Sequence, residues 1–266
     1  MRVVALHRDV IVFVSRVWQT SCTAIRAGEE AFVIDSPVYP DELEALPAVL
    51  EQASFPVAGL LATHGDWDHL LGRLAFPSAS LGAAESTAAR LRDEPGGAAR
   101  ELRRFDGQHY VERRASLQLG AVQALPVPGR LELGTEHQLE LHAADGHTAD
   151  GMAIAVPWAG VLVCGDYLSP VEIPMISAGG SLAAYTATLA RLRAPVATAE
   201  TVIAGHGGPV ARDQALALLD EDAAYLEALT REGIDAPLPP SRHGARQREI
   251  HAANADRIRG ATKPRR

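Results

Sequence analysis

The sequence has no hydrophobic run long enough to cross a membrane. A transmembrane helix needs about 20 consecutive apolar residues, and no stretch of the 266-residue chain approaches that length. Residues 1–9 are too short and too charged to act as an export signal ahead of the first expected strand. We therefore expect a cytoplasmic protein with no membrane partner.

Cysteine and positive charge are also scarce. Cys22 and Cys164 are the two cysteines, so nothing indicates an oxidising compartment, and we expect no disulfide. The chain carries 33 acidic and 25 basic residues, which gives a formal net charge of −8. Because a surface that binds nucleic acid is normally basic, this charge argues against a nucleic-acid partner.

The composition that remains is typical of a globular enzyme. Hydrophobic residues make up 47% and charged residues 22% of the chain, and its length allows one large α/β domain or two small ones. Short apolar runs predict strands at 10–14, 22–26, 31–34 and 57–63, and apolar residues at helical spacing predict a helix at 41–53. The second half repeats this pattern, with strands near Leu139, Ala153, Val161 and Thr201 and helices near Ala183 and at 212–231.

The most informative segment follows the buried strand expected at 57–62. It reads Thr63-His64-Gly65-Asp66-Trp67-Asp68-His69 and contains two imidazoles and two carboxylates. Such groups are costly to bury unless they are paired or bind a metal. In a tight turn, His64 and Asp66 can converge on one ion while Asp68 and His69 face a second. The spacing therefore suggests a site for two metal ions, which in hydrolytic enzymes lie roughly 3.5–4 Å apart.

Three later segments supply further ligands of the right kind. His147 follows the apolar run at 139–144, Asp166 follows the strand expected at 159–164, and His206 follows the strand expected at 201–204. Each stands beside a glycine, which lets the backbone turn sharply and approach a ligand closely. The repetition at four strand ends is strong evidence for a single metal centre.

This pattern resembles the metallo-β-lactamase fold superfamily, whose signature is H-x-H-x-D-H followed by a G-H-T histidine, a bridging aspartate and a last histidine. The resemblance extends from about Val10 to about Leu229. It implies an α/β four-layer αββα sandwich, with two mixed β-sheets between outer helices. Asp35 matches an early aspartate of the family that supports the metal loop, and the segment 181–192 resembles a helix between the last two ligands.

The resemblance also implies a role for each candidate ligand, and a cofactor of two divalent ions, expected to be zinc. The implied ligands are His64, Asp66 and His147 for the first ion, Asp68, His69 and His206 for the second, and Asp166 as a bridge. A hydroxide between the ions would be the nucleophile, and Asp68 would handle the proton as the catalytic residue. Thr63 and Thr148 are expected to form hydrogen bonds to the ligands.

Asp66 departs from the family pattern, which usually has histidine at this position. A carboxylate oxygen is a harder ligand than an imidazole nitrogen, so Asp66 favours iron or manganese and adds negative charge. The flavodiiron branch of the superfamily has a glutamate here and binds two irons. Asp66 is shorter than glutamate, so direct ligation, ligation through water, and a one-metal site all remain open.

The resemblance leads to three functional hypotheses. The first is a metallo-hydrolase that cleaves an ester, thioester or lactone bond of a small molecule, as in the glyoxalase II and lactonase groups. The second is a non-haem iron oxidoreductase of the persulfide-dioxygenase or diiron type, built on His64, His147 and Asp166. The third is a non-catalytic metal-binding protein, against which the near-complete ligand set argues.

Two regions lie outside this pattern. Residues 90–114 are charge-rich and form either a lid-like insertion, in which His109 and Tyr110 would contact substrate, or a solvated surface loop. Trp67 is expected to pack at or line the mouth of the site.

We expect a catalytic domain at 1–235 and a basic C-terminal extension at 236–266, whose end is a frayed tail. A homodimer is common in the superfamily and is possible here.

Overall fold

The first half of the chain forms a seven-stranded mixed sheet. The structure, a computed structural model, describes residues 1–261, and the basic tail expected at 263–266 lies outside the described residues. The strands follow one another in chain order across the sheet, antiparallel from β1 to β4 and parallel from β4 to β7. They are β1 (Arg2–His7), β2 (Val10–Val14), β3 (Ser21–Ala27), β4 (Glu30–Ile34), β5 (Val57–Ala62), β6 (Ser80–Ala84) and β7 (Val122–Leu125).

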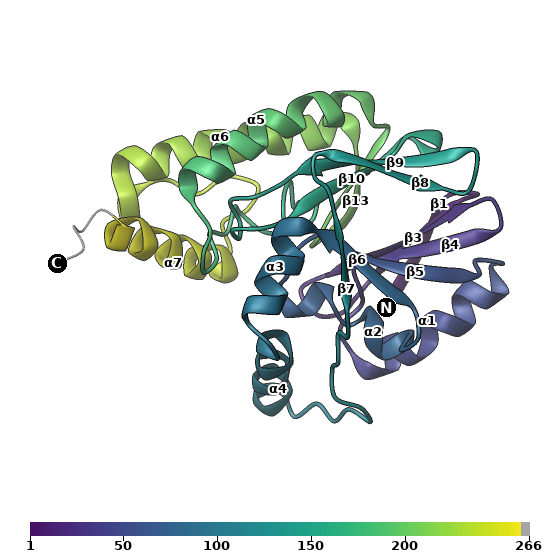
Figure 1. Ribbon diagram of the computed structural model, residues 1–266. Helices are drawn as coiled ribbons and strands as arrows, with labels where there is room; N and C mark the ends of the chain where they lie inside the picture. The colour runs from purple at the N-terminus through teal and green to yellow at the C-terminus, as the bar shows by residue number, and fades with distance from the viewer. Residues whose placement is uncertain (262–266) are drawn as a thin grey trace.

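The second half forms a six-stranded mixed sheet that packs face to face on the first (Figure 1). Its order is β13-β12-β11-β10-β9-β8, and within this sheet the described strands β11 and β12 are the only parallel neighbours. The strands are β8 (Gly129–Leu133), β9 (His137–Ala143), β10 (Met152–Val156), β11 (Val161–Val163), β12 (Thr201–Ala204) and β13 (Gly208–Ala211).

Strand β2 shows why the sheets stack in this way. All five of its residues are buried, and successive side chains of a strand point to opposite faces. Val12 packs into the core between the two sheets, whereas Phe13 packs into the core beneath the first sheet. A strand buried on both faces reads as a continuous apolar run, which is the pattern seen at 10–14.

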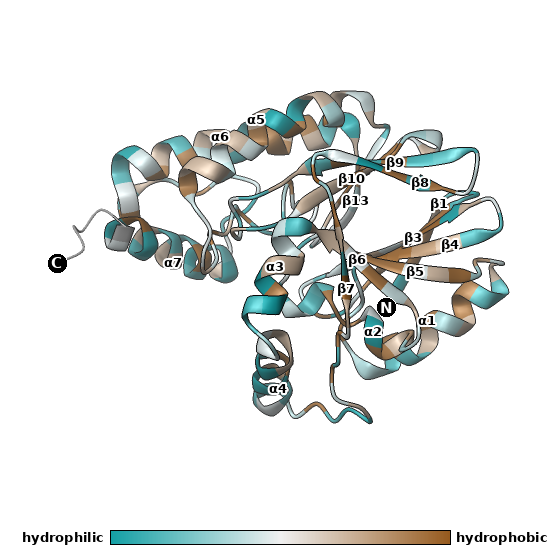
Figure 2. Ribbon diagram, in the orientation of Figure 1, coloured by the Kyte–Doolittle hydropathy of each residue, from teal (hydrophilic) through white to brown (hydrophobic). Residues whose placement is uncertain are grey.

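Helices cover the two outer faces. Beneath the first sheet, α1 (Pro40–Gln52) contributes Leu46 and Leu50 to the core, and α2 (Gly72–Ala75) lies beside it. On the second sheet, α5 (Leu182–Thr198) and α6 (Arg212–Glu232) pack through Leu192 and Leu219. Figure 2 shows apolar residues concentrated on the strands, with hydrophilic segments on the outer helices. The expected four-layer αββα sandwich is confirmed.

The region from 90 to 114 is largely helical. It includes the end of α3 (Glu85–Asp93) and all of α4 (Gly97–His109), which projects below the first sheet in Figure 1. Helix α4 contacts the metal loop, because Phe105 packs against Trp67 with 4.9 Å between the ring centroids. Within residues 1–261, the helices are too short or too polar to span a bilayer.

The strands that precede the candidate ligands direct their carboxyl ends toward one edge of the sandwich. Strands β4, β5 and β6 run parallel to one another, as do β11 and β12. The segments that follow these strands therefore emerge at the same edge, which is where α/β sheets usually bind ligands. The expected metal loop follows β5, Asp166 follows β11 and His206 follows β12. His147 follows β9, which is antiparallel to β10 and so runs in the same direction as β11.

A buried arginine anchors the chain beyond α6. Arg242, which precedes α7 (Ala245–Ala261), lies 2.7 Å from Asp222 of α6, and the side chains of both are 1% exposed. Its guanidinium also donates to the main-chain carbonyls of Ser169 and Glu172. These contacts hold the start of the C-terminal segment against the loop after β11. The domain boundary expected near residue 235 stays a prediction.

Removing this arginine should destabilise the protein. Arg242→Met leaves Asp222 buried without its cation, and breaking a buried pair costs about 3–5 kcal/mol. We expect the free energy of unfolding, measured by urea titration, to fall by that amount. Arg248→Met, at an exposed position of α7, should change it by no more than about 0.5 kcal/mol. Equal, small effects of the two substitutions would contradict the anchoring role of Arg242.

Candidate metal centre

Asp35 organises the loop that carries the first four candidate ligands. It follows β4 in the left-handed conformation, with a φ of 58°, which aspartate tolerates better than most residues. Its Oδ1 accepts the main-chain N–H of Thr63 at 2.8 Å, and its Oδ2 accepts the hydroxyl of Thr63 at 2.8 Å. Oδ2 also lies 3.0 Å from Nδ1 of His69. One carboxylate thus fixes both the start and the end of the loop.

The fold brings all seven predicted ligands together. Three groups have ligand atoms that lie within 4.8 Å of one another: His64, Asp66 and His147; His64, His69 and Asp166; and Asp68, His69 and His206. Asp166 lies between them, because its Oδ2 is 3.2 Å from Nε2 of His147 and 3.4 Å from Nε2 of His206. Its Oδ1 is 3.2 Å from Nε2 of His69.

The four histidines point the same nitrogen inward. Nδ1 of His147 lies 2.7 Å from the carbonyl oxygen of Met175, and Nδ1 of His206 lies 3.4 Å from the hydroxyl of Thr20. Nδ1 of His64 lies 3.1 Å from the hydroxyl of Thr63, which donates its own proton to Asp35 and so accepts from His64. Contacts of this kind fix the proton on Nδ1 and leave the lone pair of Nε2 free toward the centre.

Four of the inward atoms make no hydrogen bond to any described residue. They are Nε2 of His64, His69 and His147 and Oδ1 of Asp166, and all four are buried. Buried polar atoms are almost always hydrogen-bonded, so four such atoms without a hydrogen bond at one place indicate that they bind a further group. Imidazole nitrogens with carboxylate oxygens are a donor set for divalent metal ions. The residues present therefore fit the metals that the sequence implies.

The carboxylates make the centre attractive to cations. Burial alone lowers the pKa of His147 and His206, but Asp166 and the neighbouring carboxylates together outweigh it and raise each pKa to about 9. Burial also opposes ionisation of Asp66, yet His147, His64 and Arg90 together hold its pKa well below the ordinary value. The site thus concentrates negative charge where a bound cation, whether proton or metal ion, is stabilised.

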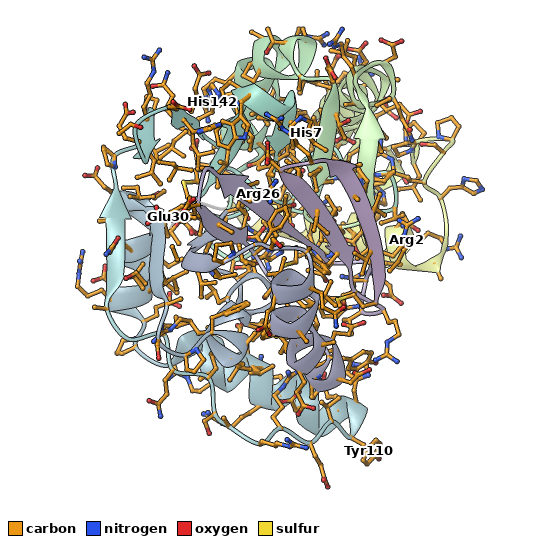
Figure 3. All side chains as sticks on the ribbon, turned by 90° about the vertical axis from the view of Figure 1, so that its right-hand side faces the viewer. Arg2, His7, Arg26, Glu30, Tyr110 and His142 are labelled. Atoms are coloured by element: carbon orange, nitrogen blue, oxygen red, sulfur yellow. The ribbon has the colours of Figure 1, made fainter. Side chains whose placement is uncertain are left out.

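The predicted substrate residues lie around α4. Trp67 is nearly buried and packs against Phe105, which in turn stacks on His109 with 4.4 Å between ring centroids. Tyr110 is 94% exposed and projects from the body of the molecule in Figure 3. Trp67 and His109 are thus linked to the metal loop through Phe105, whereas Tyr110 points to solvent. Their contact with substrate stays a prediction.

The structure also adds residues that the sequence did not reveal. Trp18 lies between Trp67 and His206, with ring centroids 5.9 and 6.4 Å away. Arg90 donates a hydrogen bond to Asp66. Thr148 differs from its prediction, because its hydroxyl donates to the main-chain carbonyl of Asp150 and not to a ligand. No local pattern marks Trp18 or Arg90, because both contact residues distant in the sequence.

Comparison with known proteins agrees with this fold. The profile of the metallo-beta-lactamase superfamily matches residues 15–206, which is most of the chain. The structure is similar to that of the DIM-1 metallo-β-lactamase, with a TM-score of 0.61 and 18% identity over 85% of this chain and 96% of that one. A metallo-β-lactamase from Pontibacter korlensis gives a TM-score of 0.60 and 19% identity over 82% of this chain and 98% of that one.

At these identities the structural likeness concerns the fold alone, and no curated protein is significantly similar in sequence. The profile match, however, spans the ligand loop at 64–69 and ends at His206, the last expected ligand. It therefore includes every residue of the candidate metal centre. The chain belongs to the metallo-β-lactamase superfamily.

Proposed function

We propose that the protein is a metal-dependent hydrolase that cleaves an ester, thioester or lactone bond of a small molecule. The observation that carries this proposal is the group of buried, unpaired imidazole nitrogens around Asp166. Bound metal ions would supply hydroxide at neutral pH and polarise the carbonyl of the substrate. The two-ion cofactor, expected to be zinc, is part of the proposal.

In this proposal the side chains of the centre hold the ions and accept the proton of the attacking water. Asp166 has one oxygen toward His147 and His206 and the other toward His69, so it can hold two cations at once. The carboxylate of Asp68 lies 3.7 Å from Nε2 of both His69 and His206. In this proposal Asp68 would help hold the second ion and would accept the proton of the attacking water.

Cys164 offers no competing chemistry. It is fully buried, and burial raises the pKa of its thiol well above the ordinary value. A nucleophilic cysteine needs an accessible thiolate with a lowered pKa. The hydrolase proposal therefore assigns Cys164 to the core, where it packs with Leu162 and Tyr167.

One observation favours a second candidate function. His64 and His147 lie together with Asp66 and Asp166, and two histidines with carboxylate oxygens are the ligand type of non-haem iron enzymes. An oxidoreductase of the persulfide-dioxygenase or diiron type would use this group. The identity of the metal separates the two proposals.

Metal content is the first test. We expect purified wild-type protein to hold about two divalent ions per chain, mainly zinc, because the ligand set divides into two groups around Asp166. Elemental mass spectrometry of wild type and of Asp66→His measures this, and the variant should keep its zinc. Iron at about one ion per chain, with O₂ consumed in the presence of a thiol, would instead support the oxidoreductase.

Substitution of Asp68 tests the hydrolytic role. Asp68→Asn should lower kcat on the best substrate of an ester, thioester and lactone panel by about 10²–10⁴-fold, because it removes a proton acceptor. The loop should stay folded, since Ser36 still donates to the main-chain carbonyl of residue 68. Metal content measured on the same sample separates loss of proton transfer from loss of the ion.

Asp93→Asn is the matched control, because Asp93 is an exposed aspartate at the end of α3. Its kcat should equal that of the wild type. Hydrolysis by Asp68→Asn at the wild-type rate would contradict the role of Asp68. A fully metal-loaded wild type that cleaves nothing in the panel would contradict the hydrolase proposal itself.

A further inference from the structure

The two carboxylate oxygens of Asp66 face in different directions. Oδ2 faces the imidazoles, 3.4 Å from Nε2 of His147 and 3.8 Å from Nε2 of His64. Oδ1 accepts a hydrogen bond of 2.8 Å from Nη2 of Arg90, in α3. One oxygen is therefore free to bind an ion, while the other is held by a cationic side chain.

Arg90 is itself fixed by a second carboxylate. Its Nη1 donates to Oδ1 of Asp150 at 2.8 Å, and Oδ2 of Asp150 accepts the main-chain N–H of Gly65 at 2.9 Å. The side chain of Asp150 is 1% exposed, so its charge would be buried without a cationic partner if the arginine were absent. Arg90 thus connects Asp66 to the segment that follows His147.

The shape of the site suits this bridge. A Cβ atom on Gly65 would lie 3.2 Å from Oδ2 of Asp150 and 3.3 Å from Nη1 of Arg90. These distances are shorter than an ordinary van der Waals contact, so a side chain at Gly65 would crowd the pair. A guanidinium presents donors in a planar fork, so its Nη1 and Nη2 can bind two carboxylates at once. A lysine has a single ammonium group and cannot reproduce this arrangement.

We propose that Arg90 is a positioning residue that holds Asp66 so that one of its oxygens faces a metal ion. Its charge also balances the carboxylate that this chain carries in place of the imidazole usual in the family. The inference rests on the proposed metal site but not on any reaction there. Residues that orient metal ligands contribute about 10- to 100-fold to metal affinity, so Arg90→Gln should weaken the binding of one zinc ion by that factor.

The test is competition for Zn²⁺ with a chromogenic chelator, with the metal content of each protein measured in parallel. Arg90→Gln should lose affinity at the ion bound by His64, Asp66 and His147, while the ion bound by Asp68, His69 and His206 is retained. Arg90→Lys should recover part of the loss, because it keeps the charge. Arg92→Gln removes the same charge from an exposed position of α3 and should match the wild type. Thermal melts of the metal-free proteins check folding.

A second background separates positioning from folding. In Asp66→His the carboxylate is absent, so adding Arg90→Gln should change zinc affinity by no more than about twofold. Equal losses in both backgrounds, or no loss in either, would overturn the proposal.

The outcomes also distinguish this inference from the hydrolase proposal. A wild type whose zinc affinity depends on Arg90, but which cleaves no substrate, supports the positioning role and contradicts the hydrolase. A wild type that hydrolyses, while Arg90→Gln keeps full zinc affinity, supports the hydrolase and overturns the positioning role.

Discussion

The candidate metal centre depends on the buried carboxylate of Asp35. It binds the N–H and the hydroxyl of Thr63 and lies beside Nδ1 of His69, so three groups that would otherwise be buried and unpaired share one acceptor. Its own N–H donates to the carbonyl of Leu61 at the end of β5. The parallel pairing of β4 and β5 thus positions Asp35, and the side chain of Asp35 positions the loop. Thr63 continues the same series of hydrogen bonds to His64.

Main-chain hydrogen bonds join the two halves of the sandwich where their ligands meet. The N–H of Met152 donates to the carbonyl of Thr63 at 2.7 Å, and the N–H of Ser21 donates to the carbonyl of Gly205 at 2.7 Å. Each bond lies within three residues of a candidate ligand in one half or the other. The apolar core between the sheets holds the strands, and these bonds hold the strand ends. The free-energy cost of placing several imidazoles and carboxylates close together is therefore offset by the packing and hydrogen bonds of the strands in both halves.

The sequence predicted the candidate metal ligands better than it predicted the strands at the edges of the first sheet. His64 and His206 could be found because each follows a strand with a buried end, β5 or β12, and stands beside a glycine. His147 stands beside Gly146 shortly after the half-buried β9. These features are local. Strands β1 and β7, at the two edges of the first sheet, were not predicted. The apolar run of β1 is short and lies in a charged N-terminal segment, and β7 is only four residues long and includes Gln123. Trp18 and Arg90 were missed for another reason. Arg90 pairs with carboxylates 24 and 60 residues away, and in a charge-rich helix it is indistinguishable from a solvated arginine.

The pairing of Arg90 with Asp66 changes how the departure from the family pattern is understood. From the sequence alone, Asp66 both hardens the ligand set and adds a negative charge. In the folded protein the guanidinium lies 2.8 Å from that carboxylate, and the charge of Arg90 is shared with Asp150. The added charge is therefore partly balanced within the site, whereas the exchange of nitrogen for oxygen remains. Any altered metal preference of this chain should then follow mainly from ligand hardness and geometry, with the partly balanced charge as a smaller contribution.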